Sequence, residues 1–86
     1  MADHKEVAVA LEETVKKVLQ QVLDVNPNDI DPNKSLEDAF EVDSTEMVEI
    51  TVGIKKALGL SDMENNVLKK EHSFNRMIEI LKEKGA

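Results

Sequence analysis

Ser44 has the clearest potential for chemistry, because it follows Asp43 at the head of a strongly acidic stretch. Between positions 35 and 54 the chain has six acidic residues and no basic one. A catalytic serine needs a general base, and the two histidines are His4 and His72. Neither is linked to Ser44 by a recognisable pattern, and no oxyanion-hole glycines flank the serine. We therefore predict that Ser44 is an attachment point and that the chain is not an enzyme.

Other site chemistries have weaker support. The chain has no cysteine, so its own side chains supply neither disulfides nor thiolates. Asp and Asn stand at alternate positions in two short runs, Asp24-x-Asn26-x-Asn28 and Asp29-x-Asp31-x-Asn33, as they do at the start of a calcium-binding EF-hand loop. The required glycine and glutamate are missing from that pattern, and prolines interrupt it. We expect polar turns there and no metal site.

Hydrophobic periodicity predicts that helices position Ser44. Apolar residues recur at helical spacing over residues 6–24, 43–58 and 73–84. The two aromatic residues are both Phe, so aliphatic side chains must build the core. The predicted fold class is all-α, a small four-helix bundle with three longer helices, one short helix and a long first loop. The length favours a single domain over residues 1–86.

The segments between these helices are predicted from turn residues. Pro27 and Pro32 mark the long first loop, since each disfavours helix at the preceding residue. Ile30, the apolar residue between them, is expected to fix this loop to the core. A short helical turn is expected over residues 35–40, and residues 62–70 are expected to form a short helix or a turn.

Capping residues define the predicted helix ends. Asp43 and Glu46 have the spacing of a capping box, and Asp3 and Ser73 are the other predicted N-caps. Gly59 is expected to end the helix that Asp43 begins. Ser44 itself has two interpretations at this point. Its hydroxyl either caps the helix, or carries a phosphate-linked group, which the N–H groups and dipole of a helix start would favour.

Charge and hydropathy limit the partners. A net charge of −7 argues against nucleic acid, which needs clustered Lys and Arg, and fits attraction to basic protein surfaces. No apolar run approaches the length of a membrane span, and no export signal is present. A cytoplasmic monomer is expected.

Three segments follow one another in a recognisable order: residues 15–30, residues 35–40, and Asp43-Ser44 followed by Met-Val-Glu-Ile at 47–50. Through them the chain resembles the acyl carrier protein family over roughly residues 6–84. The first segment is similar to the first helix and loop of that family, the second to the segment before its second helix, and the third matches the family's Asp-Ser-Leu-x-x-Val-Glu-Leu in register.

This resemblance implies a 4′-phosphopantetheine arm esterified to Ser44, with Asp43 as the adjacent motif residue. The arm ends in a thiol that carries acyl groups as thioesters, in fatty-acid or related lipid or secondary-metabolite synthesis. The implied partners are a phosphopantetheinyl transferase and acyl-transferring or condensing enzymes with basic docking patches. The positions that match the family's docking face are Glu41, Glu46, Met47, Val48 and Glu49.

The sequence departs from the family at several positions. Thr45 replaces the usual leucine, Glu41 the usual glycine, and Lys55-Lys56 an acidic continuation of the helix. These changes suggest a specialised carrier with dedicated partners. Gly53, in the middle of a predicted helix, indicates either close packing of another helix or a space left open. In the second case the small residues Gly53 and Ala57 would leave room for an acyl chain between helices. Two alternatives stay open: a carrier of aminoacyl, peptidyl or D-alanyl groups, and an unmodified acidic helical interaction domain in which Ser44 is only a cap.

Overall fold

The computed structural model describes the backbone of residues 4–86 and the side chains of residues 10–86. Within these residues the elements are four α-helices and one turn of 3-10 helix, with no strand longer than an isolated bridge. They are α1 (His4–Leu23), η1 (Pro27–Asp29), α2 (Leu36–Phe40), α3 (Ser44–Leu58) and α4 (Phe74–Glu83). The predicted all-α fold with three longer helices and one short helix is confirmed. The predicted cap Asp3 lies outside the described residues.

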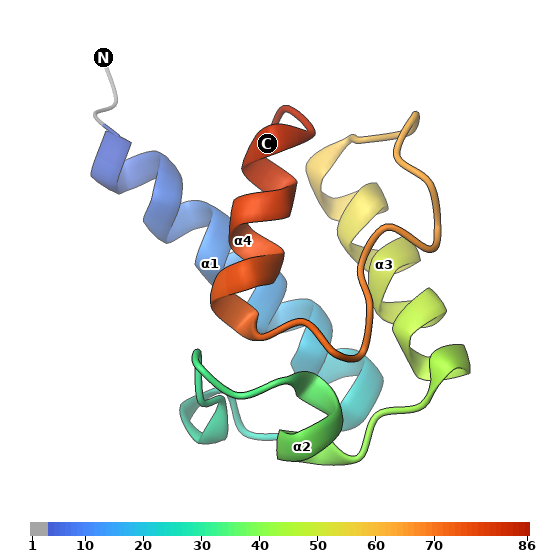
Figure 1. Ribbon diagram of the computed structural model, residues 1–86. Helices are drawn as coiled ribbons and strands as arrows, with labels where there is room; N and C mark the ends of the chain where they lie inside the picture. The colour runs from blue at the N-terminus through green and yellow to red at the C-terminus, as the bar shows by residue number, and fades with distance from the viewer. Residues whose placement is uncertain (1–3) are drawn as a thin grey trace.

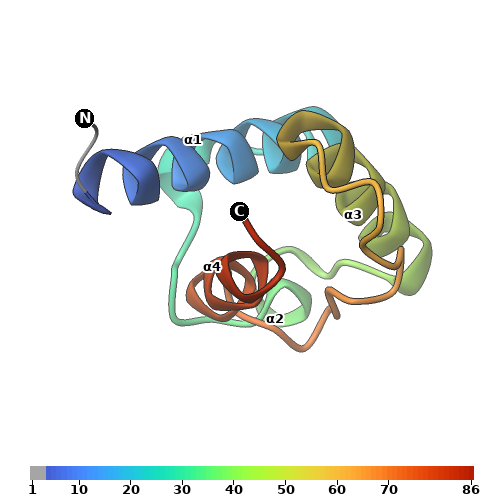
Figure 2. The same ribbon diagram turned by 90° about the horizontal axis from the view of Figure 1, so that it is seen from above.

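The three longer helices surround one core (Figures 1 and 2). α1 packs against α3, α4 lies across the open side of this pair, and α2 closes the end at which α3 begins. The core is aliphatic apart from Phe74, and its most completely buried members include Val15, Leu19, Ile50 and Leu81. This burial holds the valine-rich α1 in place, since β-branched residues are poorer helix formers.

Two core positions were not expected from the sequence. Ile80 of α4 is buried, and so is Val42, which lies in an otherwise acidic stretch and has 2% of its surface exposed. Ile30 is half-buried against the core, as predicted. Thr51 is the buried polar side chain among the described residues, and its hydroxyl donates to the Met47 carbonyl at 2.7 Å.

α1 and α3 approach each other closely at Gly53. A Cβ atom placed on Gly53 would lie 2.9 Å from Cγ1 of Val18, which is closer than van der Waals contact permits. The glycine therefore allows the two helices to pack at this point. The alternative expectation, that Gly53 and Ala57 leave room for an acyl chain, is wrong, because Val18 fills the space at Gly53 and Ala57 is exposed.

Residues 59–73 connect α3 to α4 without forming a helix. The segment runs back along α3 as a series of turns (Figure 1), which was one of the two predicted forms. Met63 and Leu68 anchor it in the core.

A backbone clasp holds the end of this segment against the start of α2. Ser35 and Ser73 form an isolated antiparallel bridge, and the Leu36 N–H donates to the His72 carbonyl at 3.1 Å. The Glu37 N–H donates to the Lys70 carbonyl at 3.0 Å, and the two side chains form an ion pair at 2.9 Å. The clasp fixes residues 70–73 beside the chain that leads into α3.

Replacing Gly53 with alanine is expected to destabilise the fold. In a helix interior alanine is more favourable than glycine by about 1 kcal/mol. Overpacking of the new methyl group against Val18 costs about 1–3 kcal/mol, which outweighs this gain. Urea unfolding measures the net change. A double-mutant cycle with Val18→Ala should show a favourable coupling, because the shortened side chain makes room for the new methyl group. A Gly53→Ala variant more stable than the parent chain would contradict the close approach.

Stability is expected to depend on His72 below neutral pH. Its Nδ1 accepts the Lys69 N–H at 3.0 Å, a bond that the protonated ring cannot accept. Burial, with Arg76 and Lys69 nearby, lowers the pKa of His72 below 6.5, against an opposing contribution from Glu71. The unfolded chain therefore binds this proton more readily, so the stability is complete above pH 6.5 and falls as the pH drops toward the folded-state pKa.

His72→Asn is the variant that isolates this effect, because its amide oxygen keeps an acceptor that does not titrate. Thermal unfolding of both proteins should show that the His72 chain loses more stability than the variant between pH 7 and about pH 5. Carboxylates titrate in both proteins, so the difference between the two curves reports His72. Parallel curves would show that the Lys69 bond does not govern protonation.

Candidate functional site

Ser44 is the first residue of α3, and its side chain is exposed. The helix start is capped by its neighbours. Oδ1 of Asp43 accepts the Glu46 N–H at 2.8 Å, and Oε1 of Glu46 accepts the Asp43 N–H at 3.1 Å. The predicted capping box is confirmed, and Asp43 is the residue that caps. The hydroxyl of Ser44 is therefore not required to begin the helix, which removes the simplest alternative interpretation of this serine.

The chain reaches Ser44 through a tightly constrained turn. Glu41 ends α2 in the left-handed conformation, with φ 54° and ψ 40°. This conformation explains why the resembled family has glycine there, since glycine adopts it without steric cost. Val42 then inserts into the core, and Asp43 turns the chain into α3. The buried valine thus anchors the residue pair before the serine. An apolar residue isolated among acidic ones was the available sequence signal.

A surface hollow of about 210 Å³ lies beside Ser44, between the start of α3 and the returning segment. Met47, Val48 and Leu68 form its apolar side, and the segment contributes the charged residues Lys69, Lys70 and Glu71. Val48 stands one helical turn after Ser44 and therefore shares its face. The hollow places apolar surface and charged groups of both signs next to the same hydroxyl.

The helix start suits a phosphodiester attached to Ser44. The first N–H groups of a helix have no intrahelical partner, and the dipole makes this end positive. Glu46 N–H is occupied by Asp43, so the N–H groups at Ser44 and Thr45 are the ones that helix geometry leaves for an anion. Lys69 adds positive charge across the hollow, whereas Lys70 is already paired with Glu37. These residues fit a phosphate-linked arm, whose thiol would supply the reactive group that a chain without cysteine lacks.

The predicted docking residues do not all lie on the surface. Glu41 and Glu49 are exposed, and Val48 is the exposed large apolar side chain among residues 10–86, at 43%. Glu46 is half-buried and held by the capping box. Met47 has only 4% of its surface exposed, because it points into the core with Ile50. Its assignment to the docking face is therefore not supported, and it contributes to the edge of the hollow instead.

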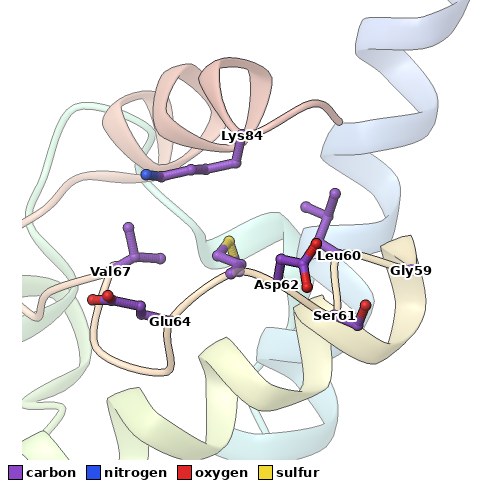
Figure 3. A pocket seen from close by; sticks show the side chains of 8 residues that line it. Gly59, Leu60, Ser61, Asp62, Glu64, Val67 and Lys84 are labelled. Atoms are coloured by element: carbon purple, nitrogen blue, oxygen red, sulfur yellow. The ribbon is translucent and has the colours of Figure 1, made fainter.

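Two further features lie away from Ser44. A hollow of about 420 Å³ at the far end of α3 is bounded by residues 59–64, Val67 and Lys84. Figure 3 shows Lys84 extending over it from the end of α4. No cluster of three or more potential metal ligands occurs in the described part of the chain. His72 binds the Lys69 N–H within its own turn and does not border the hollow at Ser44.

None of the described helices is both long enough and apolar enough to cross a membrane.

Comparison with known proteins identifies the family of the chain. Residues 13–80 match the family described as "Phosphopantetheine attachment site", which covers most of the chain and includes the whole of α2 and α3. No curated protein and no solved structure matches the chain significantly.

Members of this family are carriers rather than catalysts, and they hold 4′-phosphopantetheine covalently. They are served by a phosphopantetheinyl transferase and by the enzymes that use the arm. The match extends across the capped start of α3, the hollow beside it and the clasp that shapes that hollow. The chain therefore belongs to the phosphopantetheine-binding carrier protein family.

Proposed function

We propose that Ser44 carries the phosphopantetheine arm and that the chain delivers acyl groups to enzymes of fatty-acid or related lipid or secondary-metabolite synthesis. The observation that carries this proposal is the exposed hydroxyl of Ser44 at a helix start that Asp43 already caps. A modifying enzyme reaches such a hydroxyl without unfolding the helix. The N–H groups and dipole then stabilise the phosphodiester that forms.

The surroundings of Ser44 favour acyl cargo over aminoacyl cargo. Met47, Val48 and Leu68 give the adjacent hollow an apolar side. A hydrocarbon chain that leaves water to lie against this surface lowers the free energy of the system. The charged ammonium of an aminoacyl or D-alanyl group gains no such free energy from an apolar surface. The peptidyl, aminoacyl or D-alanyl carrier is the second candidate.

Docking of partner enzymes is assigned to the exposed face around the start of α3. Val48 offers apolar surface, and Glu41 and Glu49 offer negative charge on either side of Ser44 in the sequence. A basic patch on a partner complements this charge and mainly raises the rate of association. Lys56 continues the Glu49 face two turns further along, so it restricts which basic surfaces fit.

Ser44→Ala is expected to abolish attachment of the arm. The intact mass after treatment with a phosphopantetheinyl transferase should rise by one phosphopantetheine in the parent chain and stay unchanged in the variant. The unfolding free energy should change by less than about 0.5 kcal/mol, because Asp43 still caps α3. Thr45→Ala removes the neighbouring exposed hydroxyl and is the matched control, which should still be modified.

An equal mass increase in the Ser44→Ala variant would show that the arm is attached to another residue. A parent chain that the transferase does not modify would instead support the unmodified interaction domain.

Glu49→Lys is expected to slow modification by the transferase. Reversing one exposed docking charge should lower kcat/KM by about 3- to 10-fold at low salt, and the effect should shrink as salt screens charges beyond about 8 Å. Glu49 is preferred to Glu46, whose substitution would also remove the capping box.

Glu83→Lys makes the same charge change at the last residue of α4 and should leave the rate unchanged, because the end of α4 lies far from the start of α3 (Figure 1). Equal rates for the Glu49 variant and the parent chain at low salt would place the docking face elsewhere.

A further inference from the structure

The last turn of α3 carries positive charge, although the net charge of the chain is −7. Lys55 and Lys56 are the basic residues of that turn, and neither has an ion-pair partner among the described residues. Lys56 is exposed, and Lys55 Nζ donates to the side-chain oxygen of Asn65 at 2.9 Å. Because Asn65 is neutral, this bond orients the charge of Lys55 without neutralising it. Both ammonium groups are therefore available to another molecule.

An open hollow of about 380 Å³ adjoins the two lysines. It lies between the last turns of α3 and the returning segment, and its lining residues are Val52, Lys55, Lys56, Gly59, Ser61 and Asn65. Val52 is half-buried and supplies the apolar part of the helix wall. The described residues that line the hollow include no carboxylate. A molecule that fits it therefore combines negative charge with an apolar group.

The lysines continue the exposed face of α3 to which partner docking is assigned. Successive residues of a helix are turned by about 100°, so Lys56 lies only about 20° around the helix from Glu49 and about 10 Å further along its axis. Val52 stands between these two residues on the same face. Along its axis the face thus presents negative charge, then apolar surface, then positive charge.

We propose that the last turn of α3 is a second docking contact, which binds a surface of the partner enzyme that carries carboxylates beside an apolar side chain. The proposal rests on the proposed function of the chain as a carrier and names the chemistry of its partner. The apolar side chain contacts Val52 in the hollow, and the carboxylates pair with Lys55 and Lys56. The basic patch that Glu49 attracts lies about 10 Å away, so the partner presents both signs of charge in one fixed order.

This contact makes Lys55 and Lys56 specificity-determining residues. An enzyme whose docking surface is basic along its whole length is attracted by Glu49 and repelled by the two lysines. An enzyme with carboxylates at the second position is attracted at both ends. Cations in the last turn of a helix also stabilise the helix through its dipole. The test therefore needs a measurement that a purely stabilising role would not change.

The probe is a phosphopantetheinyl transferase with a basic docking patch, in which each basic residue of the patch is replaced by Glu in turn. The measurement is kcat/KM for modification of the carrier at low salt, where exposed charges are screened least. Each transferase variant is combined with the parent carrier and with Lys56→Glu, which leaves the bond between Lys55 and Asn65 in place. Coupling between the two substitutions reports a charge contact, which a change in carrier stability alone would not produce.

At least one transferase variant is expected to modify the parent carrier about 3- to 10-fold faster than the original enzyme does, because its new carboxylate meets the two lysines. The Lys56→Glu carrier should be modified faster by the original enzyme and more slowly by that variant. Lys55→Gln/Lys56→Gln, which removes the charges without reversing them, should give rates between these extremes.

Lys34→Glu is the matched control for Lys56→Glu, because it also reverses one exposed lysine. Lys34 belongs to the segment between η1 and α2, which lies away from α3 in both views (Figures 1 and 2). This carrier should keep the pattern of rates of the parent chain.

The inference is overturned if no transferase variant modifies the parent carrier faster than the original enzyme, or if the gain is equally large with the Lys56→Glu carrier. A parent chain that the original enzyme leaves unmodified, while the Lys56→Glu carrier is modified, would support it as the extreme case of rejection. A chain that is modified in no pairing would overturn the proposed function and this contact with it. Modification without coupling overturns the second docking contact alone.

Discussion

The close approach of α1 and α3 at Val18 and Gly53 is the constraint on which the arrangement depends. A side chain at position 53 would separate the helices, because its Cβ would lie 2.9 Å from Val18. With the glycine, Val15 and Leu19 of α1 and Ile50 and Ile54 of α3 are completely buried in the core that the helices share. One side of α3 is thus committed to packing. The face that carries Ser44 is left for the returning segment and for ligands.

The clasp between Ser35 and Ser73 holds the returning segment in position beside the start of α3. Residues 59–73 have no helix of their own, so Met63, Leu68 and the backbone bonds to α2 must hold them beside α3. The hollow at Ser44 exists because this segment is held at a distance from the helix. Protonation of His72 acts on the turn at the end of the same segment, so low pH is expected to loosen the wall of the hollow as well as the fold.

Two opposite charge patterns lie close together on α3. The acidic residues lead into the helix and follow its outward face, where they suit attraction of basic partner surfaces. Lys55 and Lys56 follow in the last turn of the helix, and Lys69 and Lys70 lie on the returning segment beside its start. Lys56 lies two turns after Glu49 on the same face, so one short helix presents negative charge near its start and positive charge near its end.

Much of this protein follows from local sequence rules. The helix ends were predictable because Asp43, Glu46, Ser73 and Gly59 act on backbone groups within a few residues of themselves. The serine at the head of the acidic helix, and the family to which the pattern belongs, were predictable for the same reason. The amphipathic stripes also identified most of the core. They missed Val42, which is buried outside any helix.

The remaining features were decided by contacts between segments that are distant in the chain. The sequence left open whether Gly53 makes room for a helix or for cargo, and the position of Val18 settled this. The resemblance assigned Met47 to the docking face, whereas its burial places it in the core. From the sequence, Lys55 was one charge on the solvent-exposed side of a helix. In the structure its ammonium donates a hydrogen bond to the side chain of Asn65, ten residues further on, which orients it toward the returning segment. Local propensity determines which residues share a helix face, whereas only tertiary packing determines what that face meets.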